Sequence, residues 1–139
     1  MGRTISDMVA KNGWTFFRAR EKETIRELSA LKESVIATGG GAVMDKDNVD
    51  CLATNGFFVL LKADISTMIE RIQSDETSQQ QRPDLADGGI YHETKTMITQ
   101  RMPTYEKVAD MAIDTTCLSI DEVVDKIMQN TLAETEPKD

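Results

Sequence analysis

Apolar and charged residues alternate with a helical period over much of this chain. Phe17, Ile25, Leu28 and Leu31 fall on one face of a single helix, with charged residues on the other face. Ser119 and Glu122 form the pattern of a capping box, and Asp64 is a typical N-cap. The spacing predicts helices over residues 5–9, 14–31, 47–54, 64–72 and 119–132.

Short apolar runs between these helices predict strands. The β-branched run over residues 35–38 indicates a brief strand, and the continuous apolar run over 57–61 is typical of a strand buried on both faces. Residues 111–113 lie between two helical segments and predict a third strand. Because strands alternate with helices, we expect an α/β fold with a parallel sheet, formed by one domain over residues 1–132.

Residues 74–89 form a polar stretch that contains Arg82 and Pro83. A connection of this length inside a compact domain is usually a functional lid or an insertion, and the alternative is a low-complexity surface loop. We expect a lid. Residues 133–139 are polar and predict a frayed tail.

Composition and charge restrict the partners. The chain has 139 residues, and 16 Lys and Arg against 24 Asp and Glu give a net charge of −8. This charge argues against nucleic acid or an anionic membrane as a ligand, and no apolar stretch is long enough to span a bilayer. Cys51 and Cys117 lie in unlike contexts without a nearby His, so neither a disulfide framework nor a metal site is indicated. We expect a cytoplasmic monomer.

Three glycines follow the first predicted strand. Gly39, Gly40 and Gly41 lack a Cβ, so a ligand can approach their backbone N–H groups. Such a junction suits contacts to the hydroxyls or anionic oxygens of a ligand. The alternative is that the glycines only form a tight turn between a strand and a helix.

Four motifs follow one another along the chain: Phe-Arg-Ala-Arg-Glu at residues 17–21, Thr-Gly-Gly-Gly at 38–41, Arg-Pro at 82–83 and Arg-Met-Pro-Thr-Tyr at 101–105. Together they resemble the shikimate kinase family, and the resemblance extends from Thr4 to about Met128. The resemblance implies a three-layer parallel-sheet P-loop kinase fold. It also implies an enzyme that uses ATP and Mg²⁺ to phosphorylate the 3-hydroxyl of shikimate, on the route to chorismate and the aromatic amino acids.

The resemblance assigns roles to the charged residues of these motifs. Arg18 and Arg101 match the arginines that clamp the shikimate carboxylate, and a guanidinium fork suits a planar anion. Glu21 matches the residue that pairs with the arginine at the position of Arg18 and contacts a hydroxyl of shikimate. Arg82 matches the lid arginine, which is catalytic and contacts the nucleotide. Taken alone, Arg18 and Glu21 could also be a solvated pair on a helix.

The other motif residues receive supporting roles from the same resemblance. The backbone of Gly39, Gly40 and Gly41 matches the substrate donors of the family. Phe17 and Pro83 would line the apolar side of the shikimate ring, and we expect Tyr105 to have a packing role.

The nucleotide motif of the family does not occur in this sequence. No Gly-x-x-x-x-Gly-Lys-Ser/Thr is present, so the chain offers no phosphate-cradling loop and no lysine from it. The resemblance implies that the first strand, the P-loop and the second strand are lacking, which leaves a gap one strand wide between residues 35–38 and 57–61. We therefore expect the acceptor and lid part of a shikimate kinase, inactive by itself. The alternatives are a non-catalytic shikimate-binding or regulatory homologue and a small α/β interaction domain.

Overall fold

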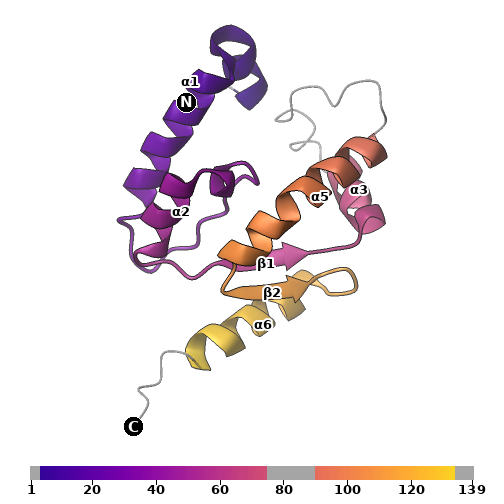
Figure 1. Cartoon of the computed structure of the whole chain (residues 1–139). Coiled ribbons are helices and arrows are strands. Elements are labelled where there is room, and N and C mark those ends of the chain that lie inside the picture. Colours follow the sequence, from indigo (N-terminus) through magenta and orange to yellow (C-terminus); the bar gives the residue numbers. More distant parts are fainter. Residues whose placement is uncertain (1–3, 75–89, 134–139) are drawn as a thin grey trace.

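The structure, a computed structural model, describes residues 4–74 and 90–133 (Figure 1). Its first helix, α1 (Ile5–Leu28), begins with a capping box in which the Thr4 side chain accepts the Asp7 N–H at 3.1 Å. Gly13 has a φ of 79° and interrupts the helix. The two predicted helices are therefore confirmed as the two arms of a kinked α1, which ends three residues before the predicted Leu31.

The next elements are a short 3₁₀ helix, η1 (Ala42–Met44), and α2 (Lys46–Ala53), which confirms the helix predicted over 47–54. Asp45 caps α2, because its side chain accepts the Asp47 N–H at 2.9 Å. A small buried core of Ile25, Ala42 and Leu52 fastens α1, η1 and α2 to one another. This core fixes the position, relative to α1, of Gly39, Gly40 and Gly41, which are called the glycine loop.

Two parallel strands form the sheet of the described residues: β1 (Val59–Lys62) and β2 (Met111–Asp114). The strands predicted at 57–61 and 111–113 are thus confirmed, with β1 beginning two residues later. Burial of β1 on both faces was wrong, since the Leu61 side chain is 53% exposed.

The strand predicted over residues 35–38 is absent. Val35 is fully exposed, and residues 34–39 run between α1 and η1 without pairing to β1. A strand requires the N–H and C=O groups of a neighbour, and among the described residues none lies beside this segment. The β-branched run is compatible with an extended backbone, but its propensity does not supply a partner.

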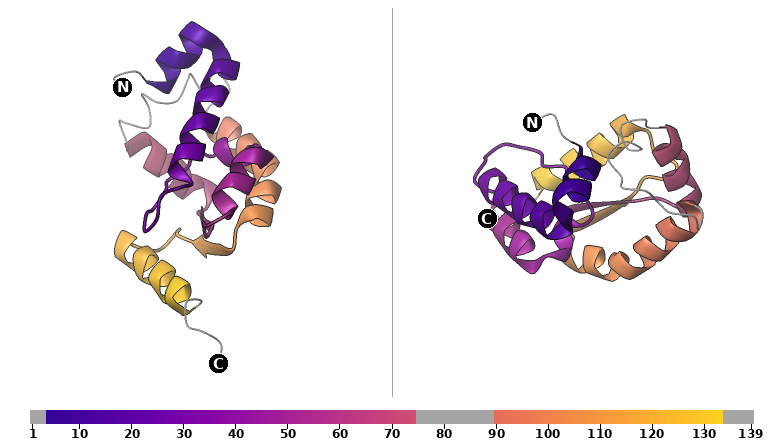
Figure 2. Two further views of the ribbon diagram at one scale, coloured as in Figure 1. Left: turned by 90° about the vertical axis from the view of Figure 1, so that its left-hand side faces the viewer. Right: turned by 90° about the horizontal axis from the view of Figure 1, so that it is seen from above.

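The described residues contain three further helices: α3 (Ile65–Ser74), α5 (Ile90–Val108) and α6 (Ile120–Ala133). α5 and α6 lie on opposite sides of the sheet, as the two directions of view agree (Figures 1 and 2). The predicted caps are confirmed at Asp64, which accepts the Thr67 N–H at 2.7 Å, and at Ser119 with Glu122. None of the helices described here is long and apolar enough to cross a membrane.

Candidate functional site

An open pocket of about 380 Å³ lies where α1, the glycine loop and α5 meet. It is lined by Arg18, Gly41, Met44, Asp45, Lys46 and Arg101. Three of these residues belong to the predicted site, and they come from three segments that are far apart in the sequence. The fold therefore brings the two predicted clamp arginines to one cavity.

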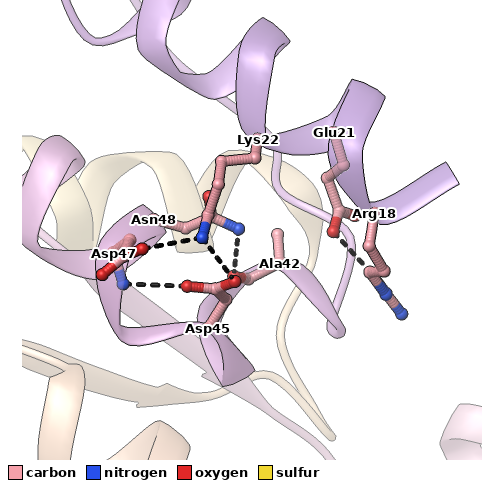
Figure 3. A network of polar contacts seen from close by, with 7 residues as sticks. All are labelled: Arg18, Glu21, Lys22, Ala42, Asp45, Asp47 and Asn48. Atoms are coloured by element: carbon pink, nitrogen blue, oxygen red, sulfur yellow. Dashed lines mark hydrogen bonds and ion pairs between the residues drawn. The ribbon is translucent and has the colours of Figure 1, made fainter. Parts of the chain in front are cut away.

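The side chain of Arg18 is held from two sides. Its Nη1 lies 2.5 Å from Glu21 Oε2, one helical turn further along α1 (Figure 3). Its guanidinium carbon lies 5.2 Å from the centre of the Phe17 ring and 5.5 Å from that of Trp14. These contacts restrict the guanidinium to few orientations. Phe17 thus contacts the arginine and is not among the residues that line the pocket.

The glycine loop directs its carbonyl groups toward the protein. The Gly39 and Gly41 oxygens accept the N–H groups of Ala42 and Met44, at 2.9 and 3.3 Å. Among the described residues, the N–H groups of Gly40 and Gly41 have no acceptor. The loop therefore offers hydrogen-bond donors beside the two arginines.

Tyr105 has a role that sequence reasoning missed. Its hydroxyl donates to the Gly40 carbonyl oxygen at 2.8 Å, so it does more than pack. Arg101 and Tyr105 are four residues apart on α5 and share one helix face, with the motif residue Pro103 between them. That spacing is the signal that could have assigned both residues to the same loop.

An ion-pair network beside Arg18 was also missed. Lys22 Nζ lies 2.7 Å from Asp47 Oδ2 and 3.1 Å from Asp45 Oδ2 (Figure 3). The hydrogen bonds that Lys22 donates to Asp47 and, second in effect, to Asp45 hold the pKa of Lys22 above its ordinary value of 10.5. The hydrogen bond from Lys22 in turn lowers the pKa of Asp45 below 3.8. No sequence motif marks this network, because its partners belong to different helices.

Several predicted residues are not part of the described site. Arg82 and Pro83 lie outside the described residues, as does nearly all of the predicted lid, whose first residue Ser74 ends α3. Residues 134–139 of the predicted tail also lie outside them. Both cysteines are free thiols, and no cluster of three His, Cys, Asp or Glu side chains in residues 4–74 and 90–133 could hold a metal ion.

Known proteins resemble this chain in sequence over most of its length. The sequence model of the family described as shikimate kinase matches residues 1–132. The shikimate kinase of Syntrophus aciditrophicus is 42% identical, over 92% of this chain and 70% of that protein. The shikimate kinase of Rhodopirellula baltica is 30% identical, over 92% and 68%.

Solved structures show the same similarity in three dimensions. The shikimate kinase from Acinetobacter baumannii in complex with shikimate superposes with a TM-score of 0.87 at 29% identity, over 98% of this chain and 74% of that one. The shikimate kinase from Aquifex aeolicus gives a TM-score of 0.72 at 25% identity, over 96% and 74%. Both the sequence and the fold place this protein with the same enzymes. The chain therefore belongs to the shikimate kinase family.

Proposed function

We propose that this chain binds shikimate in the pocket between α1, the glycine loop and α5, and presents its 3-hydroxyl for ATP-dependent phosphorylation. The observation that carries this proposal is that Arg18 and Arg101 line one pocket, although they come from two separate helices. Two guanidinium groups at one small cavity suit a ligand with a single carboxylate. The volume of about 380 Å³ is in the range of small-molecule sites.

The net charge of −8 makes this local pair of arginines important. An anionic ligand is repelled by the protein as a whole, so its binding depends on cations at the site. Glu21 Oε2 lies 2.5 Å from Arg18 Nη1. Glu21 therefore neutralises part of the charge on Arg18 and fixes the orientation of its guanidinium group. Arg101 then supplies a second cation for the carboxylate.

The hydroxyl groups of shikimate find complementary partners nearby. The N–H groups of Gly40 and Gly41 are donors, and the Glu21 carboxylate is an acceptor. Binding of a polyhydroxylated carboxylate is thus served by both kinds of hydrogen-bonding group. In support, one of the similar structures is a shikimate kinase in complex with shikimate.

The family implies the use of ATP and Mg²⁺, but the sequence lacks the motif that holds the phosphates in that family. The 139 residues contain no phosphate-binding loop lysine, and the described residues contain no cluster of metal-binding side chains. Arg82 remains the proposed catalytic and nucleotide-contacting residue and Pro83 a proposed ring contact, both on motif resemblance. A cytoplasmic monomer remains the proposed state.

Calorimetric titration of shikimate tests the proposal. We expect saturable binding to the wild-type chain, and a loss of about tenfold or more in affinity for Arg101→Ala, since a charge-assisted contact is removed. Lys107→Ala is the matched control, because it removes a cation from the last turn of the same helix, outside the pocket. Circular dichroism establishes that each variant is folded. Absence of binding by a folded wild-type chain would refute the proposal.

A further inference from the structure

Lys22 joins α1 to the segment that forms one wall of the pocket. It follows Glu21 directly in the sequence, and its ammonium group lies between the Asp45 and Asp47 carboxylates (Figure 3). The Lys22 side chain is 29% exposed, so part of its stem is covered by protein. The same turn of α1 therefore carries Glu21, which pairs with Arg18, and Lys22, which pairs with the segment after the glycine loop.

The linked segment is held firmly from its other side. Asn48 is 2% exposed, and its side-chain NH₂ donates to the Ala42 carbonyl oxygen at 2.9 Å. Asp45 caps α2 through the Asp47 N–H at 2.9 Å. These contacts and the Lys22 ion pairs all involve residues 42–48. They therefore hold Met44, Asp45 and Lys46, which line the pocket, in position relative to α1.

Asp45 creates an electrostatic problem that Lys22 solves. Asp45 lines the same pocket as Arg18 and Arg101. Without Lys22, its carboxylate would be free to pair with an arginine of the clamp and would repel an incoming carboxylate. With Lys22 at 3.1 Å, the Asp45 charge is already engaged.

We propose that Lys22 is a positioning residue of the shikimate site: it engages Asp45 and so leaves Arg18 and Arg101 available to the carboxylate of the substrate. This inference rests on the proposed function and extends it, because Lys22 itself does not line the pocket. It is a further determinant of carboxylate affinity, acting through Asp45.

Substitution of Lys22 by Met gives the first test, since Met keeps the length of the stem and removes the charge. We expect Lys22→Met to bind shikimate about tenfold more weakly, because the Asp45 carboxylate then competes for the two arginines and repels the carboxylate of the ligand. Arg20→Met is the matched control, because Arg20 is a cation two residues earlier on α1 that pairs at 2.7 Å only within its own helix, with Glu23. Equal affinity of the two variants would overturn the inference.

A second substitution separates a charge effect from loss of structure. Asn is as good an N-cap as Asp, so Asp45→Asn keeps the cap of α2 and removes the competing charge. We expect Lys22→Met/Asp45→Asn to recover affinity to within about threefold of wild type, and Lys22→Arg to bind like wild type. A double variant as weak as Lys22→Met, with both folded, would contradict the inference.

A readout without ligand distinguishes this inference from the proposed function. Amide hydrogen exchange over residues 41–47 is expected to increase in Lys22→Met and not in Arg20→Met, because the segment loses its link to α1. If wild type fails to bind shikimate, the proposed function fails, and the exchange experiment still decides whether Lys22 positions the loop. Unchanged exchange in Lys22→Met would contradict that role.

Discussion

The Tyr105 hydroxyl donates a hydrogen bond of 2.8 Å to the carbonyl oxygen of Gly40, which joins α5 to the glycine loop. Arg101, one turn earlier on α5, lines the pocket beside Gly41. This bond therefore sets the distance between one arginine of the clamp and the N–H groups of the loop. It is the contact by which residues far apart in the sequence act as one site.

Removal of this hydrogen bond is expected to loosen the loop. Tyr105→Phe keeps the ring and loses only the hydroxyl, so the free energy of unfolding should fall by about 1 kcal/mol. Shikimate affinity should fall severalfold, because Gly40 and Gly41 are no longer held in place. Urea unfolding and calorimetry measure the two effects. Wild-type values for both would show that the bond contributes nothing in solution.

The lack of a side chain at Gly41 gives a second prediction. A Cβ at this position would lie 2.7 Å from Arg18 Nη1 and still closer to Nη2, whereas a Cβ at Gly39 would meet nothing within 4 Å. Gly41→Ala should thus displace the Arg18 guanidinium and weaken shikimate binding about tenfold, with little change in stability because the Arg18 side chain is 39% exposed and its displaced end can enter solvent. Gly39→Ala is the control and should bind like wild type. Equal losses in both variants would assign the effect to loop entropy.

The proposed carboxylate clamp requires arginine and not merely positive charge. Arg101→Lys keeps the charge but loses the planar fork, so we expect shikimate affinity to fall about threefold. The loss should be smaller than that of Arg101→Ala. Titration of both variants under the same conditions checks this order. A lysine variant as tight as wild type would indicate a simple electrostatic site.

Catalysis by the 139-residue chain alone is not expected. No lysine-bearing phosphate loop occurs in it, so shikimate, ATP and Mg²⁺ should give no ADP above background in a coupled assay. Arg101→Ala, which is expected to bind shikimate weakly, gives the background rate of ADP release. ADP release that depends on shikimate and disappears in this variant would show that the chain binds nucleotide by other residues.

Acid should destabilise the protein through the caps of its helices. The Thr67 N–H lowers the pKa of Asp64 below 3.8, and the Ser119 N–H lowers the pKa of Glu122 below 4.5. A lowered pKa in the folded state means that the unfolded chain takes up protons first. The stabilisation is therefore complete above these ordinary values and is lost as the pH falls through them toward the folded values.

Urea midpoints at about pH 6 and about pH 3 measure this loss. Asp64→Asn keeps an N-cap but cannot ionise, so its midpoint should change less with pH than that of wild type. Asp121→Asn is a suitable control, because Asp121 is an exposed acid in the first turn of α6. The same pH dependence in all three proteins would exclude a contribution from Asp64.

The local elements were predictable because their signals lie within a few residues of each other. The capping box of Ser119 with Glu122 and the cap at Asp64 mark helix starts that the structure reproduces. The pairing of Arg18 with Glu21 likewise follows from the spacing of one helical turn. The motifs of residues 17–21, 38–41, 82–83 and 101–105 in combination indicated the family, which the comparisons confirm.

Contacts between distant segments were decided only by the tertiary structure. Val35–Thr38 has the composition of a strand but forms none, since hydrogen bonding in a sheet depends on a neighbour that local sequence cannot specify. The bond from Tyr105 to Gly40 and the ion pairs of Lys22 each depend on how two helices and a loop pack. The sequence by itself thus determined the helices and the family of this protein, whereas packing decided which of its groups meet at the pocket.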